Sequence, residues 1–156
     1  MNSKLNTPKP KLSLSVQYAV EPDGVPSRPR FRKWALAALQ QGEAQVTLRI
    51  VGEEEGRALN RDYRGKDYAT NVQTIVYDDL PGAPLAGDMV LCAPVVTREA
   101  AEQGKAAEAH YAHLMVHGML HLQGYDHEDE AEAQVMEALE SQIVMGLGYP
   151  DPYRAD

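Results

Sequence analysis

Histidines are concentrated in one short stretch of this chain, and their spacing is that of metal ligands. All five lie between residues 110 and 127, and three of them, His117, His121 and His127, surround a glycine at position 124. Side chains four residues apart on a helix lie one above the other, so the rings of His117 and His121 can point at one ion. Gly124 can adopt the left-handed conformation that reverses the chain after a helix, which brings His127 back. The pattern predicts a three-histidine metal site.

Three neutral imidazoles leave one position of a tetrahedral ion open to water, as in catalytic rather than structural zinc sites. We therefore predict one Zn²⁺ per chain, although nickel and copper would bind the same nitrogens. His113 lies on the same helix face and either supports the site or serves the fold. His110 begins that face and is expected to be partly exposed. Asp126 is expected either to orient a histidine ligand by accepting its hydrogen bond or to stabilise a turn.

Composition restricts the class of protein. The chain has 156 residues, is 44% apolar and 24% charged, and carries a net charge of −8. A protein this acidic is not expected to coat nucleic acid or membranes non-specifically, although a local basic patch could bind RNA. The single cysteine, Cys92, excludes an intrachain disulfide and a CxxC zinc ribbon. No signal peptide or apolar run of 18 residues is evident, so a cytoplasmic protein without a membrane segment is expected.

The elements that must position the histidines follow from periodicity and turn residues. Alternating or β-branched runs predict four strands, at residues 12–18, 45–51, 71–77 and 88–92. Helical spacing, caps and glycine stops predict five helices, at residues 27–41, 53–63, 97–103, 105–122 and 128–145. Strands and helices do not alternate strictly, which favours an α+β fold. We expect one domain over residues 11–150, a disordered tail at 1–10 and a C-terminal tail at 151–156.

The spacing HxxxHxxGxxH also occurs in metzincin proteases, which place a glutamate general base directly after the first histidine. Here that position is Gly118, so peptidase chemistry lacks its usual proton acceptor. The run His117–His127 instead resembles the signature HGxLHLxGYDH of the YbeY family, bacterial endoribonucleases and rRNA maturation factors. Residues 59–72 resemble a second motif of that family, and Gly87-Asp88 begins a third. Residues 73–75, Gln-Thr-Ile, depart from the family's usual Leu-Ser/Thr-Phe.

The resemblance implies a zinc-dependent endoribonuclease of single-stranded RNA, acting in 16S rRNA 3′-end maturation and ribosome quality control. The implied fold is a four-stranded, mixed sheet packed with helices, with the histidine helix at its centre. The implied partners are rRNA, the small ribosomal subunit and its assembly proteins. His117 would then serve catalysis as a metal ligand, and the metal would activate water and polarise a phosphoryl oxygen.

Arg64 matches the family's functional arginine. A guanidinium can bind a phosphate through two hydrogen bonds and stabilise the negative charge that develops in the transition state. Arg61 and Lys66 flank it and either extend a phosphate-binding strip or are solvated surface charges. Asn71 is expected to fix its loop by hydrogen bonds. The sequence does not choose a general base among Asp126, Asp88 and a zinc-bound hydroxide.

The acidic run on the last helix is expected to be a solvated face, whereas the basic cluster on the first helix is either solvated or part of a basic cleft, which must lie beside the zinc if the protein acts on RNA. The acidic run on the last helix comprises Glu128, Asp129, Glu130, Glu132, Glu137 and Glu140, and a basic cluster at 28–33 lies on the first helix. Two other functions remain open: a ribosome-assembly factor that binds RNA and has a mainly structural zinc site, and a metallopeptidase. Loss of RNA cleavage on metal removal and in His117→Ala would favour the nuclease over the assembly factor.

Overall fold

The computed structural model describes residues 10–40, 42–77 and 82–153, so most of the tail expected at 1–10 and the last three residues lie outside it. In this part of the chain the elements follow the order β1 (Lys11–Tyr18), α1 (Arg28–Ala38), β2 (Glu43–Val51), α2 (Glu53–Arg64), β3 (Val72–Val76), β4 (Leu85–Cys92), α3 (Ala93–Glu102), α4 (Ala107–Leu122) and α5 (Glu130–Gly146). None of the described helices is long and apolar enough to span a bilayer.

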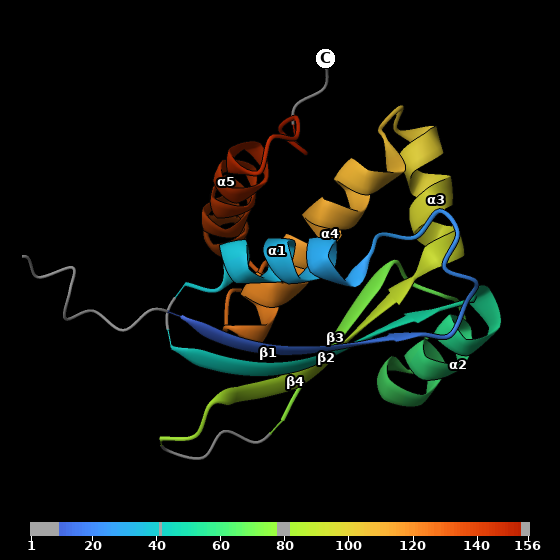
Figure 1. Ribbon diagram of the computed structural model, residues 1–156, viewed down its shortest axis with the longest axis horizontal. Coiled ribbons are helices and arrows are strands. Elements are labelled where there is room, and N and C mark those ends of the chain that lie inside the picture. Colours follow the sequence, from blue (N-terminus) through green and yellow to red (C-terminus); the bar gives the residue numbers. More distant parts are fainter. Residues whose placement is uncertain (1–9, 41, 78–81, 154–156) are drawn as a thin grey trace, which may run out of the picture.

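The strands form one mixed sheet in the order β1-β2-β4-β3. β1 pairs parallel with β2, β2 pairs parallel with β4, and β3 runs antiparallel to β4 at the edge. In Figure 1, α1, α4 and α5 lie on one side of the sheet and α2 lies on the other. The expected α+β fold with a four-stranded mixed sheet is confirmed.

Alternation along β4 explains why helices cover both faces of the sheet. Successive strand residues point to opposite faces. Met89 is fully buried and lies against Gly118 of α4, where an added Cβ would come within 2.8 Å of its Sδ and Cε. Cys92 points the other way, toward Gly56 of α2, with 3.1 Å between its Sγ and a Cβ built there. The histidine helix therefore rests directly on the centre of the sheet.

Two element boundaries were predicted wrongly around β4. The strand begins at Leu85 rather than at residue 88, because residues 85–87 already pair with β2. The glycine at 87 suggested a loop, but it lies within the strand where β3 and α4 approach closely. A Cβ there would be 2.6 Å from the Ile75 carbonyl oxygen and 2.9 Å from Leu122. Helix α3 begins at Ala93, directly after β4 and with a proline in its first turn, rather than at Thr97.

Helix α1 ends at Ala38 rather than at the expected residue 41, because a side chain from α4's end takes over its last hydrogen bonds. The amide of Gln123 donates to the Ala38 carbonyl at 2.8 Å and accepts from the Gln40 backbone at 2.9 Å. The basic cluster on α1 is used in part to fix the fold: Arg32 donates to the Leu12 carbonyl at 2.9 Å, and Arg28 lies 4.8 Å from the centre of the Tyr18 ring.

Candidate metal centre

The end of α4 brings the three predicted ligands together. The helix stops at Leu122, and Gly124 has a φ of 100°, the left-handed conformation that its place in the spacing predicted. The Tyr125 amide then donates to the Leu120 carbonyl at 3.1 Å, which fixes the reversal. His127 follows this turn and faces the helix. The ring centroids are 5.5 Å apart for His117 and His127, 6.0 Å for His121 and His127, and 6.4 Å for His117 and His121.

These separations approach those of a coordinated trio without reaching them. Imidazoles bound to one tetrahedral zinc ion at about 2.0–2.1 Å have centroids roughly 5 Å apart. As they stand, no three His, Cys, Asp or Glu side chains among the described residues are arranged to hold an ion. The ring centroids would have to approach one another by roughly 0.5–1.4 Å, which rotation about side-chain torsions allows. Coordination by the trio therefore remains a prediction.

Hydrogen bonds to the outer ring nitrogens suit the trio to metal binding. Nδ1 of His117 lies 3.1 Å from Oε2 of Glu140, and Nδ1 of His121 lies 3.1 Å from the Tyr125 carbonyl oxygen. Both partners are acceptors, so each Nδ1 carries the proton and each Nε2 keeps its lone pair free. This arrangement is the usual one for zinc-bound histidines, whose second nitrogen donates to a carboxylate or carbonyl. The chemistry of the donor set fits zinc.

Glu140 is the centre of this hydrogen-bond network. Its carboxylate is 1% exposed and accepts from Nε2 of His113 at 2.7 Å and from the Tyr153 hydroxyl at 2.7 Å, besides His117. Burial alone would raise the pKa of Glu140, but the hydrogen bonds from the two histidines and the tyrosine outweigh it and lower that pKa to about 2. The ionised Glu140 carboxylate therefore orients the His117 ring through Nδ1 and leaves Nε2 free.

A parallel network ties the beginning of α4 to the second motif. Nε2 of His110 lies 2.9 Å from Oε1 of Glu99, which also accepts from the Asn71 side chain at 2.9 Å. Asn71 accepts in turn from the Val72 backbone at 2.6 Å, so it fixes its loop as expected. His110 is 4% exposed, contrary to the expectation of partial exposure. Burial lowers its pKa, against the opposing effect of Glu99, so the ring is held neutral.

The remaining predicted site residues are placed differently. Asp126 accepts from the backbone amide of His127 at 2.7 Å, so it stabilises the turn, and among the described residues no hydrogen bond or ion pair joins it to an imidazole. Arg64 ends α2, on the face of the sheet opposite α4. Among the described residues, no hydrogen bond or ion pair joins Arg64, Arg61 or Lys66 to the histidines, and Arg61 lies 3.7 Å from Asp62. Their role in substrate binding stays a prediction.

Position 118 cannot supply a general base. Gly118 is buried, and its missing side chain would point into Met89 of the sheet rather than toward the histidines. The space beside the ligands is instead a cavity of about 290 Å³, whose walls include His117, His127, Glu137, Glu140 and Tyr153. The acidic residues that face this space therefore come from α5.

Sequence reasoning missed Glu140 and Tyr153. Glu140 was grouped with solvated acids, and that expectation is wrong for this residue. A signal was present: Met136, Glu140 and Val144 follow one another at intervals of four and are the buried positions of α5. A carboxylate in the buried stripe of a helix requires partners. Tyr153 lies in the segment expected to be a tail, where no periodicity marks it.

Comparisons with known proteins agree with the sequence motifs. The family model described as endoribonuclease YbeY matches residues 24–148. An endoribonuclease YbeY of Methylobacillus flagellatus is 60% identical over 147 residues, covering 94% of this chain and 97% of the relative. One from Aromatoleum aromaticum is 58% identical over 156 residues, covering 98% and 99%. A solution structure of TM1509 from Thermotoga maritima, 20% identical, shares the fold with a TM-score of 0.52, over 90% of this chain and 99% of that one. The chain therefore belongs to the endoribonuclease YbeY family.

Proposed function

We propose that this protein is a zinc-dependent endoribonuclease of single-stranded RNA, which acts in the cytoplasm in 16S rRNA 3′-end maturation and ribosome quality control. Its partners in this role are rRNA, the small ribosomal subunit and its assembly proteins. The names of the relatives support RNA cleavage. The observation that carries the zinc dependence is the placement of Nδ1 of His117 and of His121 against acceptors, which leaves each Nε2 free to bind an ion.

The chain's own residues have distinct tasks in this proposal. His117, His121 and His127 would hold the ion, and zinc supplies Lewis-acid chemistry and activation of water when bound. Glu140 orients His117 and keeps its Nδ1 proton in place. Arg64 is proposed to bind a phosphate of the RNA, with Arg61 and Lys66 extending the contact. Gly118, which faces the sheet, supplies no carboxylate of the metallopeptidase kind.

The test uses a 5′-labelled single-stranded oligoribonucleotide and the matching duplex as substrates. We expect cleavage of the single strand only, loss of cleavage after removal of metal, and recovery with zinc. His117→Ala should remain inactive with zinc, whereas Val135→Ala, at an exposed position of α5, should cleave normally. Cleavage that survives both metal removal and His117→Ala would come from a contaminating nuclease and would refute the proposal.

The same assay on small-subunit particles carrying 3′-extended 16S rRNA tests the proposed biological role. Trimming of the extension by the wild-type protein but not by His117→Ala is the expected result. Particles that bind the protein with no trimming would favour a binding factor with a structural zinc site. The end groups of the product distinguish attack by water from attack by the substrate's 2′-hydroxyl.

A further inference from the structure

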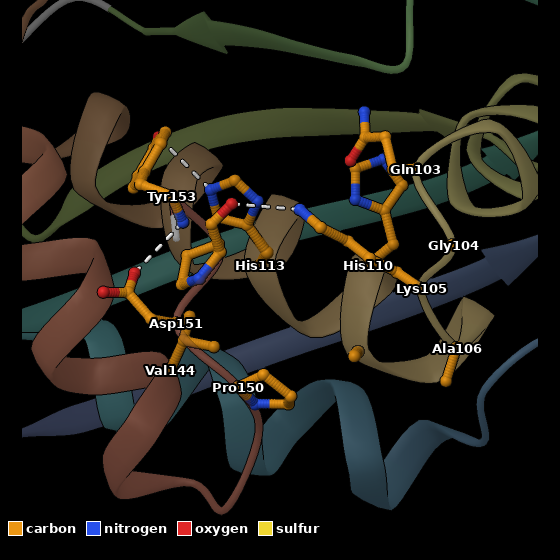
Figure 2. A pocket seen from close by; sticks show the side chains of 12 residues that line it. Gln103, Gly104, Lys105, Ala106, His110, His113, Val144, Pro150, Asp151 and Tyr153 are labelled. Carbon is orange, nitrogen blue, oxygen red and sulfur yellow. Dashed lines mark hydrogen bonds between the residues drawn. The ribbon is translucent and has the colours of Figure 1, made fainter. Parts of the chain in front are cut away.

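A second and larger cavity lies beside the metal centre, and Tyr153 is shared between the two. The cavity has a volume of about 580 Å³ and lies between the α3–α4 turn, the start of α4, the end of α5 and residues 150–153. Figure 2 shows Tyr153 and His113 on one side of it and His110 on the other. Its size is that of sites for ligands such as a nucleotide. Tyr153 also lines the smaller cavity with His117 and His127.

The Tyr153 ring is held rigidly while remaining accessible. Its hydroxyl donates to the buried Glu140, and the ring meets His113 edge-on with centroids 5.2 Å apart, yet Tyr153 is 46% exposed. The segment that carries it is fastened at two further points. Lys105 Nζ donates to the Pro152 carbonyl at 3.0 Å, and Asp151 accepts from the Ser141 hydroxyl at 2.7 Å. A fixed, accessible aromatic ring offers a nucleobase a stacking surface at little entropic cost.

The wall of the cavity formed by Lys105 and the start of α4 is suited to a phosphate. Lys105 forms part of its wall and is held there by the Pro152 carbonyl. The 16-residue helix α4 starts at the same place, and its N-cap residue, Ala106, makes no side-chain cap hydrogen bond. Helix amides without a cap and a lysine side chain together attract an anion. Asp151 also lines the cavity, but its carboxylate accepts hydrogen bonds from Ser141 and from the Tyr153 amide.

Two ring nitrogens in the cavity wall remain without a protein partner among the described residues. They are Nδ1 of His110 and Nδ1 of His113, and both are buried. Nε2 of each ring faces a carboxylate, so each Nδ1 is an acceptor. His110 as a whole is 4% exposed. Neither nitrogen is open to the cavity as the rings stand, so the amino group of a nucleobase would reach one of them only if that ring turned.

We propose that this cavity is a nucleotide subsite, in which a base of the single-stranded RNA stacks on Tyr153 while its phosphate lies near Lys105 and the start of α4. This inference rests on the proposed function and adds to it the position of the nucleotide beside the scissile one. Because Tyr153 lines both cavities, a strand that passes over it places consecutive nucleotides in the subsite and in front of the histidines.

Binding of RNA to the metal-free protein tests the subsite without any need for catalysis. The probe is a fluorescein-labelled six-nucleotide single-stranded RNA, followed by fluorescence anisotropy. We expect Tyr153→Ala to weaken binding about 5- to 150-fold, the usual effect of losing one stacked base. Tyr153→Phe keeps the ring and should bind more tightly than Tyr153→Ala. Lys105→Gln should bind more weakly and with a shallower salt dependence, and Val135→Ala should bind as the wild type does.

A second measurement guards against an effect of Tyr153→Ala on folding. Each base of the RNA is replaced in turn by an abasic ribose, and one position should weaken binding to the wild type but cause no further loss with Tyr153→Ala. Binding of Tyr153→Ala within twofold of the wild type would overturn the subsite while leaving the proposed function intact, as would abasic losses that are equal in both proteins. Absence of binding by the wild-type protein would remove both proposals.

Discussion

Replacing Glu140 by glutamine should weaken zinc binding, although the residue touches no metal. The carboxylate has two oxygens that accept three hydrogen bonds, from His113, His117 and Tyr153. A glutamine amide has the same shape but only one oxygen, and its NH₂ group donates. If that NH₂ faces His117, Nδ1 must accept, and the proton moves to Nε2. The nitrogen that should bind the ion would then have no free lone pair.

The expected size of the effect follows from similar supporting residues in other metal sites. Their loss commonly costs about 10- to 100-fold in metal affinity, which is about 1.4–2.7 kcal/mol. Tyr153→Phe removes one of the three donors and leaves the carboxylate, so its effect should be smaller. Glu137→Gln is the matched control, because Glu137 is exposed one turn earlier on α5 and lines the cavity beside His117, and within the described part of the chain it has no hydrogen bond to the histidines.

The assay is competitive titration of zinc against a chelating dye, with each variant checked for its melting temperature. Long-range ¹H–¹⁵N correlation of the metal-free protein reports the tautomer of His117 directly. We expect the Nδ1-protonated form in the wild type and in Glu137→Gln, and a changed form in Glu140→Gln. A zinc affinity of Glu140→Gln within twofold of the wild type, with an unchanged tautomer, would show that Glu140 does not control the protonation of His117.

Three further changes have defined outcomes. Gly87→Ala would place a Cβ 2.6 Å from the Ile75 carbonyl oxygen and should destabilise the fold by about 1–3 kcal/mol, and an unchanged urea midpoint would contradict the packing. Burial lowers the pKa of His110 below its ordinary value of 6.5, so its contribution to stability is complete above pH 6.5 and declines as the pH falls further. His110→Gln should therefore lose less stability than the wild type between pH 7.5 and 5.5 in urea titrations, and equal losses would count against this. Arg64→Ala should lower kcat/KM on single-stranded RNA by about 100-fold without altering zinc affinity, and an unchanged rate would remove Arg64 from catalysis, with Val135→Ala as the control for both measurements.

The fold followed from the sequence wherever periodicity and turn residues agreed. The alternation in β1 and β2 and the glycine after α4 gave these elements to within two residues. The errors arose where tertiary contacts override local signals. Gly87 looked like loop chemistry because sequence alone does not show that β3 and α4 pass too close for a side chain. The end of α1 depends on Gln123, which is distant in the sequence.

The sequence predicted that the three histidines of the candidate site lie close together, but it did not predict the residues that hydrogen-bond to them. Local spacing brought His117, His121 and His127 near one another, because a helix and one glycine turn determine their approach. The partners of His117 and His113 come from α5 and from residue 153, and no local pattern links these segments to α4. The basic residues 61–66 have no local signal that fixes their distance from the histidines, since a whole sheet lies between α2 and α4.

X-ray absorption spectroscopy at the zinc edge, on protein loaded with one equivalent of zinc, would show whether the three histidines bind the ion together. We expect three imidazole nitrogens and one further light ligand at about 2.0–2.1 Å, and loss of one imidazole contribution in each of His117→Ala, His121→Ala and His127→Ala. A sulfur neighbour, a sphere closed by four protein ligands, or a spectrum unaffected by these substitutions would contradict this expectation.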